Sequence, residues 1–381
     1  MNLLKYRILH YSEVADELDN IDGSARIFTR DLSNTVKIPL QKSLFEDSIA
    51  MLEIKNQIDV YNTESFTVAQ PENYLVQDGV IKTGYGAVTI GDLVARESLF
   101  HFPWFLYPQF HIDDFQEDGV ECVLPDSPPD IELSFGFSVC SGINENYYHW
   151  LILFLGRLSR KGLQIWSDKI HCKPTLIFPT FKNQLQYESA ALLAEHYDVP
   201  FLSLGYQASV KTKNLVVSET MRSGGVVPHP VICESLNILK KYYYKIDDYP
   251  ENIYISRRDT SNRKILNEDI IEEMFKGRGY KILTLENLSL SEQINYFAHA
   301  KKIVGPHGAG LANICFAEPG AQLLEICFPN YLSWCYRRLS AVCGLNYQHI
   351  LLSLKDDASH INNCTYLIDP IKVALCFEYG F

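Results

Sequence analysis

The segment GPHGAGLANICFAEPG, residues 305–320, holds residue types that can bind phosphate groups. It follows a predicted strand, KKIV, so it lies where the ligand crevice of a parallel sheet is expected. Glycine lets the backbone approach a ligand closely, and a helix start near Leu311 would direct N–H groups toward an anion such as a diphosphate. A tight turn between strand and helix is the structural alternative. The candidate ligands are His307, which could add a hydrogen bond or a proton, and Gly308, Ala309, Gly310 and Asn313.

Charged candidates follow two other predicted strands. The segment YISRRDTSNR places Arg257, Arg258 and Arg263 just beyond a strand, and a planar guanidinium group matches phosphate oxygens bidentately. Glu325 ends the strand LLEI, where a carboxylate can accept hydrogen bonds from both hydroxyls of a ribose. The structural alternatives are a solvated turn for the arginines and a capping or ion-paired surface residue for Glu325.

A third candidate site opens a predicted helix. The segment NENYYHWLILFLGRL would bring Asn146, His149 and Trp150 into one turn at the N-terminal end of that helix. A histidine there can act as a general base on a hydroxyl, because imidazole titrates near neutral pH. We therefore expect Asn146 and His149 to be catalytic; a buried histidine bonded to backbone is the alternative.

The sequence lacks the motifs of several other kinds of site. It contains no D-x-D triplet, so we expect no metal site of the type that sugar-nucleotide enzymes build from carboxylates. The glycines form neither a G-x-G-x-x-G fingerprint nor a P-loop, which argues against dinucleotide and P-loop binding. The ten cysteines include no C-x-x-C pair, which argues against a structural zinc site or a disulfide scaffold. We predict no metal and no cofactor.

Composition restricts the class of protein. The chain has 381 residues, enough for two domains of ordinary size, and 47% hydrophobic with 21% charged residues is typical of a globular protein. The net charge of −12 repels nucleic acid and anionic lipid, so we expect no nucleic-acid partner. The N-terminus becomes acidic before any signal-type apolar run, and no stretch is apolar for long enough to span a membrane. These features predict a cytoplasmic protein.

The predicted elements indicate an α/β fold with an N-terminal β-rich region. Short β-rich runs over 66–90 predict a meander of hairpins, and the residues from about 130 to 225 alternate strands with helices. Strands are expected at 133–140, 174–179, 200–204 and 215–219, and helices at 146–161 and 185–197. The Gly- and Pro-rich segment SGGVVPHP, residues 223–230, predicts a hinge.

A second alternating pattern follows the hinge. Ser289 and Glu292 form a predicted capping box at one of its helices. Strands are expected at 252–256, 280–285, 301–305 and 322–326, and helices at 233–245, 267–276, 291–300 and 333–344. We predict two Rossmann-like domains with a ligand cleft between them. The expected divisions are 1–129, 130–225, 226–345 and a C-terminal extension, 346–381.

Three segments together resemble glycosyltransferase family 61, which includes capsular-polysaccharide biosynthesis proteins. They are NYYHWL with Arg157-Leu158, then YISRR with Arg263, Asn267 and Glu268, then GPHGAGLANICFAEPG with LLEI. The resemblance covers about 130–345. It implies two domains of the GT-B type, with an acceptor domain at 130–225 and a nucleotide-sugar domain at 226–345, and an inverting, metal-independent transfer.

The resemblance also implies roles and partners. Asn146 and His149 would belong to the active site, and the donor would be a nucleoside diphosphate sugar, with UDP favoured as its nucleotide. The donor-binding residues would be Arg257, Arg263, His307, Gly308, Ala309, Gly310, Asn313 and Glu325, and Arg258 is a further candidate on its strand-end position. The acceptor would be a glycan or lipid-linked glycan, which is compatible with peripheral association with a membrane assembly complex at the inner face of the membrane. Leu153 and Gly156 depart from the pattern, because the family often has an acidic residue and a proline there.

Two other functions remain open on the sequence. One is a sugar-phosphate or nucleotide-sugar epimerase of similar build, which would turn over without an acceptor. The other is a catalytically silent subunit that binds the donor or supports assembly, and Leu153 is the feature that favours it.

Overall fold

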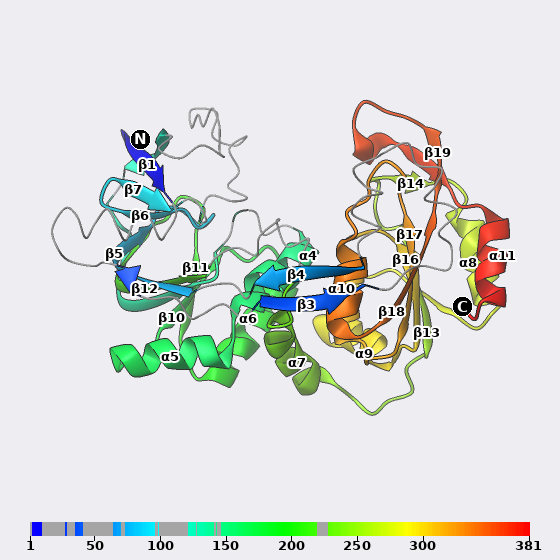
Figure 1. The fold of residues 1–381 in the computed structure, drawn as a ribbon, viewed down its shortest axis with the longest axis horizontal. Helices are drawn as coiled ribbons and strands as arrows, with labels where there is room; N and C mark the ends of the chain where they lie inside the picture. The colour runs from blue at the N-terminus through cyan, green and yellow to red at the C-terminus, as the bar shows by residue number, and fades with distance from the viewer. Residues whose placement is uncertain are drawn as a thin grey trace. The chain divides into compact units, whose positions relative to one another are not determined.

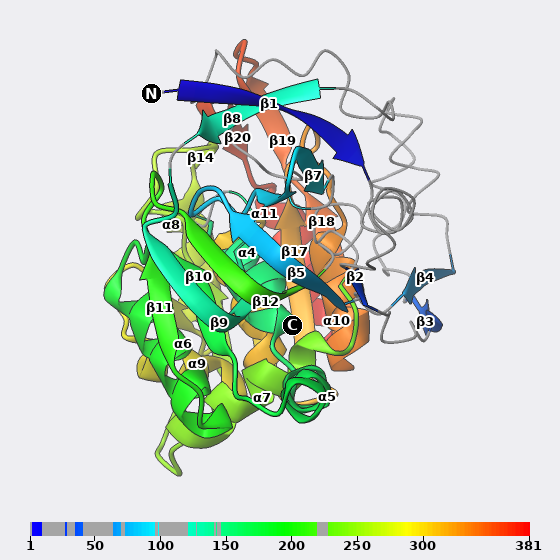
Figure 2. The same ribbon diagram turned by 90° about the vertical axis from the view of Figure 1, so that its left-hand side faces the viewer.

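A computed structural model of the chain describes eleven segments. They are residues 2–9, 27–28, 35–40, 64–69, 73–95, 98, 121–126, 128–140, 142, 146–218 and 228–381. The chain forms two compact units: Met1–Thr35 with Ala69–Gly225, and Val36–Val68 with Val226–Phe381. The predicted hinge glycines, Gly224 and Gly225, lie outside the described residues. Figures 1 and 2 show the ribbon from two sides.

A ten-stranded mixed sheet organises the first unit. Most of it follows the order β11-β10-β9-β12-β5-β6-β7-β1-β8, and β2 pairs with β5. The four strands β9 to β12 are mutually parallel where they pair, and β12 is antiparallel to β5. The strands are β1 Asn2–Leu9, β2 Ile27–Phe28, β5 Asn73–Ile81, β6 Val88–Ile90, β7 Leu93–Ala95, β8 Glu121–Asp126, β9 Ile131–Ser138, β10 Thr175–Pro179, β11 Phe201–Leu204 and β12 Val210–Ser218.

The meander predicted over 66–90 is present only in part, because 73–81 forms one continuous strand, β5, and it is not a separate region. β5, β6 and β7 are successive antiparallel strands, yet β5 also pairs with β12 over most of its length. A division at residues 129/130 would therefore cut through one continuous sheet. Side chains from both parts, including Val76, Ile90, Leu215 and Val217, share one apolar core. Two further strands, β3 Thr35–Pro39 and β4 Ser65–Ala69, form a small sheet of their own.

The helix expected over 146–161 is interrupted. It begins as α4 Tyr147–His149, continues as a π-helical turn over Trp150–Phe154 and a 3₁₀ turn over Leu155–Arg157, and ends where Leu158 becomes extended. Ser159 then caps a new helix, α5 Arg160–Ile170, by accepting a hydrogen bond from the Gly162 N–H. The other helix of this unit, α6 Gln184–Tyr197, agrees closely with the prediction.

The second unit contains a five-stranded, all-parallel sheet in the order β15-β13-β16-β17-β18. Helices α8 and α11 lie on one side of it, and α9 and α10 on the other (Figure 1). The strands are β13 Asn252–Ile255, β15 Lys281–Leu283, β16 Lys302–Pro306, β17 Gln322–Cys327 and β18 Asn346–Leu351. The helices are α7 Ile232–Tyr243, α8 Glu268–Lys276, α9 Leu290–His299, α10 Cys335–Cys343 and α11 Pro370–Glu378.

Local sequence signals determine several boundaries in this unit. The predicted capping box is confirmed: Ser289 accepts from the Glu292 N–H, and the Glu292 carboxylate accepts from the Ser289 N–H. The expected C-terminal extension does not stand apart, because β18 is the fifth strand of the sheet. A small three-stranded sheet joins β14 Lys264–Ile265 to β19 Ser353–Asp356 and β20 Thr365–Leu367.

Candidate functional site

The parallel sheet of the second unit gathers the charged candidates at one edge. Counted along the chain, its strands have the order 2-1-3-4-5, so the direction of winding reverses between β13 and β16. Ligands of open α/β sheets bind beyond the carboxyl ends of the strands at such a reversal. Arg257 follows β13 by two residues, and His307 directly follows β16. Glu325 lies near the carboxyl end of the neighbouring strand, β17.

Arg257 is held by backbone oxygens and not by a carboxylate. Its Nη1 donates to the carbonyl of His307 (3.2 Å) and its Nη2 to the carbonyl of Asn262 (2.9 Å). Nε is buried and has no partner among the residues that the structure describes. Burial, and then the nearby positive charge of Arg263, lower the pKa of Arg257 to about 10, so the side chain still carries its charge at neutral pH. A bound anion would offset both the cost of burying the guanidinium charge and its repulsion by Arg263.

Arg263 lies beside it on aromatic rings. Its guanidinium carbon is 5.1 Å from the ring centre of Phe328 and 4.8 Å from that of Tyr331, which is cation–π geometry. Its backbone has φ 54°, a conformation unusual for a residue other than glycine. No ion pair or side-chain hydrogen bond of Arg263 occurs within the described part of the chain. This cation is therefore positioned without being neutralised.

Arg258 has a different environment from its neighbour. Its Nη2 forms an ion pair with Oε2 of Glu272 on α8 at 2.5 Å, and the Glu272 side chain is only 5% exposed. The guanidinium of Arg258 thus already has a buried counter-charge. The structure does not bring it together with Arg257 and His307, although all three were predicted donor ligands.

Gly308 is required by the approach of Arg257. A Cβ atom at this position would lie 2.2 Å from Arg257 Nη1, which is far inside van der Waals contact. Gly308 has an extended backbone, φ −178°, so space and not backbone strain explains the glycine. Its carbonyl accepts a 2.5 Å hydrogen bond from the Tyr336 hydroxyl.

The turn after Gly308 is a 3₁₀ helix, Ala309–Phe316, and not the α-helix expected to start near Leu311. Ala309 and Gly310 open this helix, so their N–H groups have no partner within it. Asn313 is fully buried, and its amide donates to Gln293 Oε1 (2.9 Å) and to the Gly310 carbonyl (3.1 Å). These contacts brace the turn against α9, so the structure makes Asn313 a support of the turn where direct donor contact was predicted.

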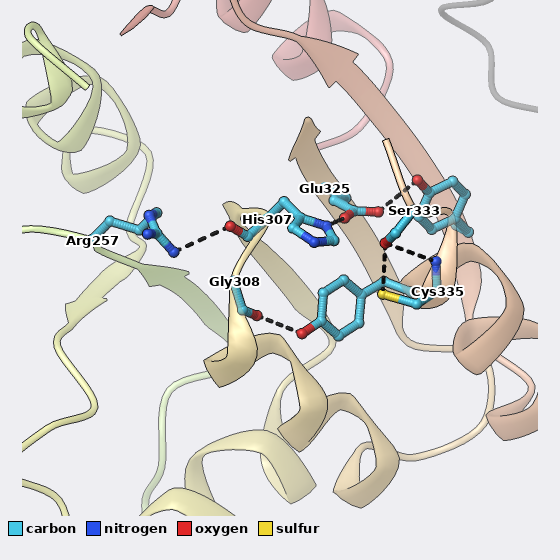
Figure 3. A network of polar contacts seen from close by, with 8 residues as sticks. Arg257, His307, Gly308, Glu325, Ser333 and Cys335 are labelled. Carbon is cyan, nitrogen blue, oxygen red and sulfur yellow. Dashed lines mark hydrogen bonds and ion pairs between the residues drawn. The ribbon is translucent and has the colours of Figure 1, made fainter. Parts of the chain in front are cut away.

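Glu325 is occupied by other protein groups, as Figure 3 shows. Oε1 lies 2.5 Å from Nδ1 of His307, and Oε2 accepts a 2.7 Å hydrogen bond from the Tyr347 hydroxyl. Its residue exposure is 1%, and that of His307 is 7%. Both carboxylate oxygens thus have protein partners in this structure, and the contact of Glu325 with both hydroxyls of a ribose stays a prediction.

The third candidate site, at the start of α4, lies in the first unit and brings together only residues that are close in sequence. Asn146 caps α4, because its Oδ1 accepts from the N–H groups of Tyr148 (2.9 Å) and His149 (3.4 Å). The His149 side chain is half-buried beside the Tyr148 ring. Leu153 is fully buried, and Arg157 Nη1 donates to the Cys140 carbonyl (3.1 Å). Asn146 thus has a structural role that its position at a helix start favours.

Comparison with known proteins gives a family match that includes most of the candidate segments. The model of the family described as glycosyltransferase 61 matches residues 147–324. These residues belong to the glycosyltransferase 61 family. A search of curated proteins found no match to the chain.

The glycosyltransferase 61 match includes most of the candidates. It begins one residue after Asn146, contains His149, the arginines and the 307–313 turn, and ends one residue before Glu325. The match supports transferase activity of the glycosyltransferase type for this region. Within the described residues, no group of three or more His, Cys, Asp or Glu side chains could hold a metal ion. No helix in that part of the chain is long and apolar enough to cross a membrane.

Glu268 was not predicted as a site residue, yet it supports Arg257 in the structure. The carboxylate of this first residue of α8 accepts from the Arg257 backbone N–H (2.9 Å) and lies 3.4 Å from the Tyr254 hydroxyl. Burial raises the pKa of Glu268 to about 7, and the neighbouring Glu272 charge contributes to the shift. Its proximity to the helix start was visible in the sequence, but its contact with Arg257 depends on how α8 packs.

Aromatic supports of the site were missed as well. Tyr336 on α10 and Tyr331 in the preceding loop place their rings 5.1 Å and 5.4 Å from the His307 ring. Ser333 caps the approach to α10 by accepting from the Cys335 N–H and donating to the Cys335 sulfur (Figure 3). The tyrosines follow β17, so their position beyond a strand end was the available signal.

Proposed function

We propose that the protein transfers a sugar from a nucleoside diphosphate donor to a hydroxyl of a glycan acceptor, by an inverting mechanism that needs no metal ion. The donor diphosphate would bind at the carboxyl ends of β13 and β16. One observation carries the proposal. Arg257 and Arg263 lie together at the strand reversal, and neither has a carboxylate partner within the described residues.

The charges of this site suit a departing diphosphate. When the bond between the anomeric carbon and the phosphate oxygen breaks, the electron pair stays on the phosphate, and the negative charge there increases. Fixed cations and N–H groups stabilise such charge because they need no reorganisation during the reaction. Arg257, Arg263 and the N–H groups of Ala309 and Gly310 would thus supply what a divalent ion supplies in other enzymes.

The acceptor side of the proposal rests on the first unit. His149 would accept the proton of the attacking hydroxyl, and Asn146 would keep the helix start in place through its capping bonds. The five-stranded parallel sheet of the second unit is consistent with a Rossmann-like donor domain. We extend the proposal to a GT-B enzyme of surface or capsular polysaccharide synthesis that works in the cytoplasm, at the inner face of the membrane, with UDP-sugars favoured.

A thermal-shift panel tests the proposed donor. A ligand that binds only the native protein raises its stability by RT ln(1 + [L]/Kd), so a true donor raises the unfolding temperature with concentration. We expect nucleoside diphosphates and their sugars, UDP first, to stabilise the protein more than the matching nucleosides. No shift with any nucleoside diphosphate or nucleotide sugar would contradict the proposal. Release of free sugar without acceptor would separate a transferase from a silent subunit.

A further inference from the structure

The carboxylate of Glu325, which was predicted to bind ribose, contacts the ring of His307. Within the described residues, the hydrogen bonds of the ring involve only Nδ1, which faces Oε1 of Glu325 at 2.5 Å. An ionised carboxylate can only accept, so Nδ1 carries a hydrogen and donates it. The tautomer and orientation of the ring are thereby fixed, in the way that a carboxylate fixes a catalytic or metal-binding histidine.

The second nitrogen, Nε2, remains available for a ligand. It is not among the fully buried polar atoms that lack a partner, although His307 as a residue is 7% exposed. The rings of Tyr331 and Tyr336 lie edge-on beside the imidazole and restrict its movement. The His307 carbonyl also accepts a hydrogen bond from Arg257, so the backbone of His307 links its own ring to the Arg257 guanidinium (Figure 3).

Glu325 is the one group near His307 that can balance a charged imidazole among the residues that the structure describes. Burial raises the pKa of Tyr347 well above its ordinary value and that of Cys335 to about 12. Burial likewise raises the pKa of Cys327. These groups are therefore neutral at physiological pH. The Tyr347 hydroxyl donates to Oε2 of Glu325 and so holds the carboxylate in its orientation toward His307.

We propose that His307, as an imidazolium, donates a hydrogen bond from Nε2 to a phosphate oxygen of the donor, and that Glu325 and Tyr347 are positioning residues that hold it in this state. The inference rests on the proposed function, because it takes the ligand to be a nucleoside diphosphate. Glu325 and His307 cancel in charge, and Arg257 and Arg263 remain to face the phosphates. No bond of His307 forms or breaks; it stabilises the charge that appears when the diphosphate departs.

Two substitutions of His307 separate its two nitrogens. In His307→Asn the side-chain amide nitrogen lies near the place of Nδ1, so it can still reach Glu325 but not the ligand. In His307→Gln the amide nitrogen lies near the place of Nε2, so a donor to phosphate is retained. We expect the Asn variant to bind UDP at least about tenfold more weakly than the parent, as the loss of a hydrogen bond to a charged group predicts. The Gln variant should lose clearly less.

The positioning residues need a readout that a structural role alone would not change. The ring nitrogens of ¹⁵N-labelled histidine report protonation, and His307→Asn assigns the signal of His307. We expect both ring nitrogens of His307 to be protonated in the UDP complex of the parent, and one of them in Glu325→Gln. Tyr347→Phe should weaken UDP binding by about threefold. Tyr280→Phe is the matched control, because it removes a buried hydroxyl that has no partner within the described residues, and it should leave the affinity unchanged.

The possible failures are distinguishable. If the parent binds neither UDP, another nucleoside diphosphate nor pyrophosphate, the proposed function itself fails. If the parent binds UDP but His307→Asn binds it equally well, or the Asn and Gln variants lose the same affinity, the inference about Nε2 is overturned while the function stands. A neutral His307 ring in the UDP complex would overturn the positioning role of Glu325.

Discussion

Two regions of the molecule contain candidate residues of similar kinds, but the residues make different contacts in each. One region is the carboxyl ends of β13, β16 and β17, and the other is the start of α4. At the strand ends, Arg257, His307 and Glu325 come from three separate segments and meet in one network. At α4, the Asn146 side chain caps its own helix by accepting a hydrogen bond from the Tyr148 N–H. Parallel strands bring distant segments to a common edge, whereas a helix start combines only neighbours in sequence. Spacing along one helix is therefore weaker support for a site than convergence from several strands.

The strongest test of this contrast is His149→Ala. If the helix start supplies the general base, the substitution should lower kcat by roughly 10²-fold or more and leave donor affinity nearly unchanged. Donor Kd and single-turnover rate are measured on the same variant. An unchanged rate would make His149 a structural residue like Asn146, and the contrast between the two regions would become complete.

Glu268→Gln tests the buried support of Arg257 through pH. The pKa of Glu268 is raised to about 7 in the folded protein. Between the ordinary pKa of a glutamate and about pH 7, the folded protein therefore keeps a proton that the unfolded chain releases. The stability that this proton contributes is present at low pH and is lost as pH rises toward and through about 7. Between about pH 5 and 8, the parent should lose about 3 kcal/mol more unfolding free energy than the Gln variant. Parallel curves of denaturant stability against pH would contradict the assignment.

Gly308→Ala should damage binding without damaging the fold. The new methyl group would displace the flexible end of Arg257, while the extended backbone tolerates alanine. We expect UDP affinity to fall by about tenfold, with a change in unfolding free energy below about 1 kcal/mol. The effect should not add to that of Arg257→Ala, because both act on one contact. Gly205→Ala is the control, since its Cβ would make an ordinary contact at 3.6 Å.

Chelation should have the smallest effect. If arginines and N–H groups stabilise the diphosphate, turnover should change by less than about twofold in EDTA. Loss of activity that Mn²⁺ or Mg²⁺ restores would show that the strand ends need a cation besides Arg257 and Arg263.

The two regions also differ in how much the sequence could reveal. The strands NIYIS, KKIVG and QLLEI and the capping box at Ser289 are local signals, and the structure confirms them. The pairing of β5 with β12 was missed, because its paired residues are 129 to 145 positions apart in the chain. The π-helical turn after His149 was also missed, because an apolar run such as WLILF carries no mark of its hydrogen-bond pattern.

Within the candidate site, residue type was predicted better than residue role. Arg257 and Gly308 lie at the expected strand ends. The absence of a side chain at Gly308 makes room for the Arg257 guanidinium. The contacts of Glu325 could not be predicted, because they include Tyr347, which belongs to the adjacent strand β18 inside the expected C-terminal extension. Arg257 and Arg258 were indistinguishable in sequence, and only the position of Glu272 on α8 separates them.

That separation offers the most direct test of the central claim, that unneutralised cations at the strand ends bind the donor diphosphate. UDP binding is measured by calorimetry for the parent, Arg257→Gln and Arg258→Gln, three proteins that differ by one charge at adjacent positions. We expect Arg257→Gln to weaken UDP binding by about tenfold or more, and Arg258→Gln, which can still donate to Glu272, to bind UDP like the parent. Equal affinity of Arg257→Gln and the parent, or an equal loss in both variants, would contradict the claim.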